Sequence, residues 1–265
     1  MNRAQRIIKY AAIALAISLI ISIVTGILTV VFTALGISYI VEIGENSIET
    51  MNVSQEYVNI HEIDLEVAAS SIEIIKADSL KVEGTNIPKD YDFTEKNGKL
   101  EIKGKKIKSG AKIVIYMPSE INSLDIEVGA GNITIKDITL QEIRLDTGAA
   151  KTDITGLIVT TKADINTGVG ETNIIDSDIT NLDMDTGIGS VELNGYLKGA
   201  SDIDCGVGNL DIDLLGTEAF YRIIAERGIG NLVINGTKVS GEQNIGTGNN
   251  ILKISGGIGN LDISY

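Results

Sequence analysis

The sequence predicts an all-β chain in which a β-solenoid of about 19–20 residues per coil follows one N-terminal transmembrane helix. Three observations support this fold class. A long uncharged apolar run stands near the N-terminus, glycine pairs recur at nearly constant intervals after it, and apolar residues alternate with polar residues around each pair. The repeats occupy most of the chain beyond the apolar run.

The composition favours short strands over helices. Hydrophobic residues make up 43% of the chain, which is ample for a core, whereas aromatic residues make up only 4% and tryptophan is absent. The chain holds 29 glycines in 265 residues, so the backbone is expected to turn often. An aliphatic core with frequent turns is typical of many short β-strands.

The apolar run covers residues 10–40 and is predicted to be a transmembrane helix. It carries no charge, and about twenty apolar residues suffice to cross a bilayer. Arg3, Arg6 and Lys9 precede the run, whereas every acidic residue follows it. Because basic flanks stay on the cytoplasmic side, residues 1–9 are expected in the cytoplasm and the C-terminal part is expected to be extracytoplasmic.

A cleaved signal peptide is the alternative interpretation of this segment. The apolar region of a signal peptide is normally about 7–15 residues long, and the run here is roughly twice that length. Two spans would need about forty apolar residues. We therefore expect a single-pass protein of the cell membrane, with the lipid bilayer as its partner through residues 10–40.

Gly-x-Gly pairs and related turns set the repeat. Their first glycines are separated by 19, 20, 19, 19, 22 and 29 residues. These glycines are Gly129, Gly148, Gly168, Gly187, Gly206, Gly228 and Gly257. Glycine accepts positive φ, so each pair lets the backbone turn sharply between two short strands.

Apolar columns appear when the repeats are aligned on these glycines. The sixth residue after each glycine is always aliphatic, and so is the third residue before it in all copies but one, which has methionine. The first column is Ile135, Ile154, Ile174, Leu193, Ile212, Ile234 and Ile263; the second is Ile126, Leu145, Ile165, Met184, Ile203, Ala225 and Ile254. Polar residues flank both columns, so the columns are predicted to point inward. Stacked copies would share one continuous core.

Two finer expectations concern the turns. Asn132, Asn209, Asn231 and Asn260 recur just after the turn, where stacked amides would form a ladder or where asparagine simply tolerates turn geometry. Gly248 stands 9 residues before Gly257, so the last turn is predicted to be a degenerate coil at a terminal cap.

The repeats divide the outer part of the chain into three regions. Residues 41–60 are predicted to be a polar stem. Residues 61–120 are predicted to be an N-terminal β cap that holds a first coil with an insertion, because Asp64–Ile74 has the same pattern as Asp125–Ile135. Residues 121–265 are the solenoid repeats.

The charge and the scarcity of reactive residues exclude several functions. Three of the 22 basic residues precede the span and all 36 acidic residues follow it, so the outer part has a net charge of −17 and is not expected to bind nucleic acid. His61 is the only histidine and Cys205 the only cysteine, so neither a Cys/His zinc site nor a histidine-dependent triad can form. We predict no catalytic, cofactor-binding or metal-ligating residues, and assign no binding residues.

Three weaker signals have an alternative structural explanation. Asp183/Asp185, Asp202/Asp204 and Asp211/Asp213 could supply oxygen ligands to calcium, or form a solvated face. Cys205 shares a column with Val128, Thr147, Thr167 and Thr186, which indicates a packed residue rather than a reactive thiol. Arg222 and Arg227 interrupt the acidic pattern; they form a surface ion pair with Glu226 or Glu218, or mark a contact for an anionic partner. Outward positions are nearly all polar, so binding is expected to use polar or cation-bridged contacts rather than an apolar groove.

The chain resembles the bacterial DUF4097 family over roughly residues 60–265. The resemblance rests on the N-terminal anchor, on Ile113–Pro118 leading into Leu124–Ile133, and on the later repeats. Members of that family are often described as adhesins, and the resemblance brings no catalytic residues with it.

We therefore expect a non-enzymatic, membrane-anchored, extracytoplasmic β-solenoid that acts as an adhesin-like binding or scaffold module, with a cell-wall or membrane-protein partner. One alternative is the sensory or regulatory ectodomain of an envelope-stress system. A second is a carbohydrate-active β-helix enzyme, which the low aromatic content disfavours. A self-polymerising cytoskeletal solenoid fits an exported acidic domain less well.

Overall fold

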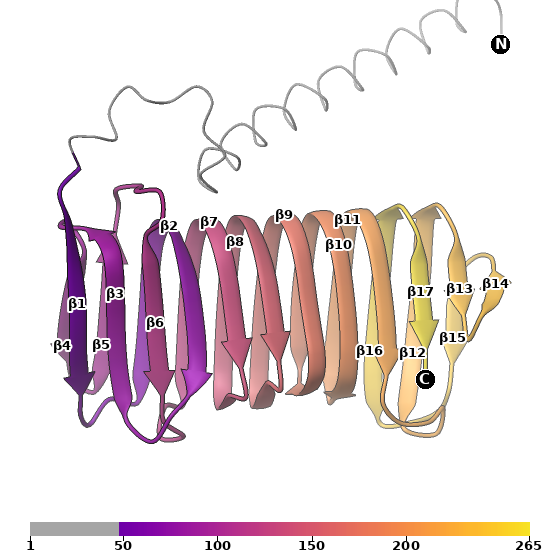
Figure 1. The fold of residues 1–265 in the computed structure, drawn as a ribbon. Coiled ribbons are helices and arrows are strands. Elements are labelled where there is room, and N and C mark those ends of the chain that lie inside the picture. The colour runs from indigo at the N-terminus through magenta and orange to yellow at the C-terminus, as the bar shows by residue number, and fades with distance from the viewer. Residues whose placement is uncertain (1–47) are drawn as a thin grey trace, which may run out of the picture.

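The computed structural model describes residues 48–265, and this part of the chain is all-β. The described residues join in one 17-stranded sheet wound into an elongated stack of coils (Figure 1). They contain no helix able to cross a membrane. The predicted cytoplasmic segment, the predicted span at 10–40 and residues 41–47 of the predicted stem lie outside the described residues.

The strands cover most of the described chain. They are β1 (Thr50–Tyr57), β2 (Glu62–Lys76), β3 (Leu80–Pro88), β4 (Asp92–Lys96), β5 (Lys99–Gly104), β6 (Lys112–Met117), β7 (Ser123–Lys136), β8 (Thr139–Thr155), β9 (Ile158–Thr180), β10 (Leu182–Lys198), β11 (Ala200–Leu214), β12 (Tyr221–Ile229), β13 (Leu232–Ile234), β14 (Thr237–Val239), β15 (Gln243–Ile245), β16 (Asn250–Ile258) and β17 (Leu261–Ser264). Residues 50–57, which the sequence analysis assigned to a polar stem, therefore form a strand of the sheet.

The central coils stack in the register that the glycine alignment predicts. Each long strand bends at its glycine pair, and we call the part before the bend the first arm and the part after it the second arm. β7, β8, β9, β10 and β11 pair in parallel in chain order. Ile126 pairs with Leu145, and Leu145 with Ile165, so the predicted inward column is confirmed.

The core is a set of aliphatic ladders inside the stack. Ile135, Ile154, Ile174 and Ile212 are each 0% exposed, as the six-residue spacing after glycine predicts. Burying one such side chain contributes about 1.5–3 kcal/mol, and repetition over the coils offsets the small size of each repeat. Thr167 and Thr186 extend the core toward the bend, where their hydroxyls form a 3.1 Å hydrogen bond between coils.

The first glycine of each pair is required by coil stacking rather than by its φ. A Cβ atom at Gly206 would lie 2.6 Å from the carbonyl oxygen of Gly187 on the preceding coil, which is too close for a real side chain. In most copies the second glycine carries the positive φ that was predicted for the turn, as at Gly208 with φ of 153°. A Cβ at Gly208 would also collide with the Gly189 carbonyl.

The coils at both ends are out of chain order. At the N-terminal end, β2 pairs with β7 on one side and with β5 and β6 on the other. The coil of β5 and β6 follows β2 in the sequence but lies farther toward the N-terminal end of the stack. At the C-terminal end, β16 pairs with both β11 and β12, and β17 pairs with both β11 and β13. The last repeat of the chain is thus inserted into the stack (Figure 1). The predicted terminal cap at Gly248–Gly257 is wrong: residues 250–264 form an interior coil.

Antiparallel strands close the two ends. β3 and β4 pair antiparallel with β6 and β5, and β1 adds to β3. β15 and β14 pair antiparallel with β12 and β13 at the other end. Short antiparallel strands end the parallel stacking, which limits the sheet edge that is open to another chain.

Candidate functional site

The outer face of the first arm carries a ladder of acidic residues that runs across the coils. In its C-terminal half, Asp183 is the lateral neighbour of Asp202, and Asp185 is the lateral neighbour of Asp204. All four side chains are exposed, and none forms an ion pair within residues 48–265. We call these four residues the acidic patch.

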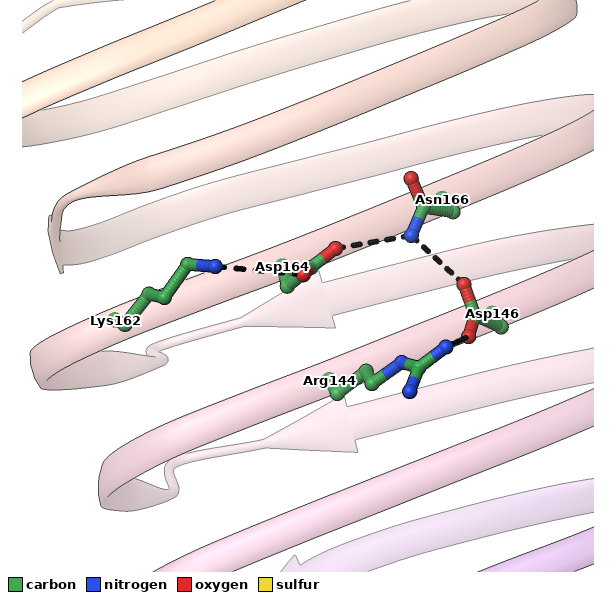
Figure 2. Close-up of polar contacts among 5 residues, drawn as sticks. All are labelled: Arg144, Asp146, Lys162, Asp164 and Asn166. Carbon is green, nitrogen blue, oxygen red and sulfur yellow. Dashed lines mark hydrogen bonds and ion pairs between the residues drawn. The ribbon is translucent and has the colours of Figure 1, made fainter.

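The N-terminal half of the same ladder is neutralised by its neighbours. Arg144 forms an ion pair with Asp146 at 2.5 Å, and Lys162 forms one with Asp164 at 3.5 Å (Figure 2). The amide nitrogen of Asn166 donates to Asp146 of the preceding coil at 2.8 Å and to Asp164 of its own coil at 2.9 Å. These contacts stop before β10, and no ion pair or side-chain hydrogen bond within residues 48–265 balances the acidic patch in the same way.

Partial burial and like charges both act on Asp185. Partial burial, followed by the negative charges of Asp204 and Asp183, raises the pKa of the Asp185 carboxyl above its ordinary value of 3.8. Asp164 and Asp202 act in the same direction more weakly. The arrangement favours a positively charged partner at this face.

A shallow groove follows the glycine bend beside the ladder. Its volume is about 450 Å³, and its floor is the glycine backbone of successive coils. It is lined by Glu127, Val128, Gly129, Asp146, Thr147, Gly148, Asn166, Thr167, Gly168, Asp185 and Gly187. One wall therefore carries carboxylates, and the groove crosses several coils along the axis of the stack.

The six aspartates that the sequence analysis weighed as calcium ligands or as a solvated face are only partly brought together. Asp183, Asp185, Asp202 and Asp204 share the first arm, whereas Asp211 and Asp213 lie on the second arm, where Asp213 accepts hydrogen bonds from Asn194 and Ser264. No group of three or more potential ligands in residues 48–265 has the geometry to hold a metal ion.

An asparagine ladder is present on the second arm, in the swapped coil order. The backbone N–H of Asn260 donates to the Oδ1 of Asn209 at 3.1 Å, and the Nδ2 of Asn231 donates to the Oδ1 of Asn260 at 3.2 Å. Asn132 does not join it, because its in-register neighbours are Ser71 and Lys151. The ladder interpretation therefore holds for three of the four asparagines.

Arg227 is an inward residue rather than a surface one. It is in register with Gly256, and Gly256 is in register with Cys205, so the arginine continues the column of Cys205. Its three guanidinium nitrogens are buried without a hydrogen-bond partner, and burial lowers the pKa of the guanidinium. The predicted ion pair with Glu226 or Glu218 is wrong, since neither Arg222 nor Arg227 forms an ion pair within residues 48–265.

Cys205 is a packed core residue, as its column predicted. It is 4% exposed, and burial raises the pKa of its thiol while the charge of Arg227 opposes that shift. His61 immediately precedes β2, and β7, β8, β9 and β10 separate β2 from β11, which holds Cys205, so the fold does not bring the two residues together.

A family model described as Toastrack DUF4097 matches residues 60–237. The chain belongs to the Toastrack DUF4097 family. No curated protein matches the sequence. The Toastrack match spans the N-terminal cap, the central coils and β12–β13, whereas the inserted coil of β16 and β17 follows it in the sequence.

Three solved structures are similar to this Toastrack chain. A putative cell adhesion protein from Clostridium sporogenes is 14% identical, with a TM-score of 0.37 and coverage of 82% of this chain and 99% of that one. A putative adhesin from Bacteroides fragilis is 13% identical, with a TM-score of 0.37 and coverage of 82% and 97%. A putative adhesin from Parabacteroides distasonis is 12% identical, with a TM-score of 0.45 and coverage of 83% and 98%.

One surface feature of the Toastrack stack was missed by the sequence analysis. The middle residues of the glycine turns stack in register, and they are small at one end and large at the other. From the N-terminal side they are Ala69, Ala130, Ala149, Val169, Ile188, Val207, Ile258 and Ile229. The sequence shows the sizes of these residues, but it does not show their order across the coils or how exposed each one is. The exposed apolar side chains at Val207, Ile258 and Ile229 are exceptions to the expectation that outward positions are nearly all polar.

Proposed function

We propose that this chain is a non-enzymatic, membrane-anchored module of the extracytoplasmic surface that binds or scaffolds a partner in the manner of an adhesin. The observation that carries the proposal is the repetition of side chains in register across the coils. A row of like groups spaced at about 4.8 Å offers many weak, equivalent contacts to an extended partner. Membership of the Toastrack family agrees with such a role.

The membrane anchor is the uncharged run at residues 10–40, with basic residues before it and acidic residues after it. The strongly acidic outer part suits exposure to solvent and disfavours contact with nucleic acid. The stack begins at β1, close behind the run in the sequence, so the anchor would hold the coils near the outer leaflet.

The orientation is tested by labelling Ser54→Cys in intact cells with a thiol reagent that does not cross membranes. Ser54 is exposed on β1, whereas the native Cys205 is buried, so the unmodified protein is the matched control and should stay unlabelled. We expect Ser54→Cys to be labelled without lysis. Labelling that requires lysis contradicts the extracytoplasmic placement.

The binding role is tested with the full-length chain in phosphatidylcholine nanodiscs, mixed with envelope fragments from cells that lack the protein. We expect the chain to sediment with the fragments and to release no reducing sugar from them. Failure to sediment beyond empty nanodiscs overturns the binding role. Reproducible release of sugar overturns the non-enzymatic assignment.

A further inference from the structure

An exposed apolar ridge runs along the bend of the C-terminal coils. Val207 is 42% exposed, Ile258 50% and Ile229 68%, and they are consecutive neighbours across β11, β16 and β12. Ile188 and Val169 continue the row as half-buried residues of β10 and β9. We call these five residues the apolar ridge.

The ridge and the acidic patch are adjacent through the chain itself. Asp185 precedes Ile188 by three residues, and Asp204 precedes Val207 by three, across the same glycine bends. Lys253 is the in-register neighbour of Asp202, but it forms no ion pair with the patch. The middle of the apolar ridge, at Ile188 and Val207, thus has unpaired carboxylates beside it, which is an unusual surface to leave in water.

The spacing of the ridge distinguishes between partner shapes. Neighbouring coils are about 4.8 Å apart, so five ridge residues span roughly 19 Å. An amphipathic helix presents apolar residues about every 5.4 Å along its axis, whereas alternate residues of a strand are about 6.6 Å apart. The helix matches the ridge more closely, and roughly 13 helical residues cover its length.

The charge of the surface decides which helix can bind. A second copy of this chain would bring two acidic patches together at the ridge, which like-charge repulsion disfavours. An anionic helix is disfavoured for the same reason. A helix with lysine or arginine beside its apolar stripe places cations against Asp183, Asp185, Asp202 and Asp204 while the stripe covers the ridge.

We infer that the apolar ridge and the acidic patch together form a docking site for a cationic amphipathic helix of a partner polypeptide. The inference rests on the proposed binding function and names the chemistry of one partner. Apolar contact supplies affinity at the ridge, and the patch sets the sign of the partner and its orientation across the bend.

The test uses a labelled 14-residue peptide of leucine and lysine, with leucines at helical spacing, and the full-length chain in phosphatidylcholine nanodiscs. Fluorescence anisotropy gives the dissociation constant, with binding to empty nanodiscs subtracted. A peptide of equal composition in which leucine and lysine alternate strictly is amphipathic only as a strand. We expect it to bind at least tenfold more weakly, and equal affinity overturns the helical match.

Two variants separate the parts of the site. V207S/I258S/I229S removes the exposed ridge, and D183N/D185N/D202N/D204N removes the patch charge. The matched control D153N/E192Q/D211N/D262N removes four charges from the outward face of the second arm. We expect at least tenfold weaker binding for the first two and less than twofold change for the control, with melting temperatures confirming that all three fold.

Each contrary result is informative. Equal weakening by the patch variant and its control reduces the effect to general charge attraction and overturns the site. Unchanged binding by the ridge variant also overturns the site, because the apolar ridge would then contribute nothing to affinity. Absence of peptide binding by the unmodified chain overturns the inference, and it leaves the proposed function standing if the chain still sediments with envelope fragments.

Discussion

Asp211 and Ile212 are adjacent in the chain but face opposite environments. Ile212 is 0% exposed and lies between Leu193 and Ile263 of the neighbouring coils, whereas Asp211 points to solvent. Burial, followed by the charges of Asp262 and Asp213, raises the pKa of the Asp211 carboxyl. Removing that charge therefore costs the fold little, while placing a charge at the next residue costs much.

We expect Ile212→Asp to destabilise the fold by about 4 kcal/mol or more, because the carboxylate would be buried without a partner. Asp211→Asn should change the free energy of unfolding by less than about 0.5 kcal/mol. Urea denaturation of both variants measures the difference. Equal stabilities would contradict the inward and outward assignment of β11.

The acidic patch predicts a pH-dependent effect at Asp185. Partial burial and the neighbouring carboxylates raise the pKa of Asp185, so in the interval just above 3.8 the folded chain holds a proton that the unfolded chain has released. The charged Asp185 therefore destabilises the fold above the raised pKa, and this destabilisation is relieved as the pH falls through it. Asp185→Asn should therefore raise the melting temperature slightly at neutral pH. Near pH 3, below the ordinary pKa of aspartate, the carboxyl is mostly protonated in both states and the substitution should leave the melting temperature unchanged. Asp153→Asn is the control: it removes a carboxylate that lies 3.8 Å from Lys151, so we expect no rise in the melting temperature at neutral pH. A gain for Asp185→Asn that is independent of pH would refute the charge argument.

At the scale of the strands, the sequence predicted the arms but not their order. The alternation of Ile126, Glu127 and Val128 predicts which side chains point inward, because successive side chains of a strand point to opposite faces. It does not state which coil lies beside which, since every repeat presents nearly the same aliphatic face to its neighbours. The insertion of β16 between β11 and β12, and the exposure of Ile258 and Ile229 that follows from it, needed the structure.

Deleting residues 250–265 tests the inserted coil. In the observed order, β12 loses its parallel partner β16, so the backbone amides of Tyr221–Ile229 should lose protection from hydrogen exchange. A stack in chain order would leave β12 paired with β11 and protected. Lys238→Gly in the outermost β14 is the control, and we expect it to leave the β12 amides protected.

At the scale of the whole molecule, stability comes from an aliphatic interior shared by all coils. Buried isoleucine, leucine and valine side chains run from the N-terminal cap to β17 in one cluster. Both ends of the stack are closed by antiparallel strands, so β1 belongs to the folded unit and the unit begins before residue 60. This contiguous core gives the described part of the chain a means of folding that requires no bound group.

Residues 48–265 produced without the preceding segment should therefore be a soluble, β-rich protein whose melting temperature is insensitive to chelators. Aliphatic ladders such as Ile135, Ile154 and Ile174 supply the core, and the carboxylates of the acidic patch repel one another without closing around an ion. Added EDTA should shift the melting temperature by less than about 2 °C, which for a domain of this size is under about 1 kcal/mol. Added calcium should at most screen the patch and raise the temperature slightly, as magnesium would at the same ionic strength. A fall of tens of degrees with EDTA, restored by calcium but not by magnesium, would show that a metal ion holds the coils together.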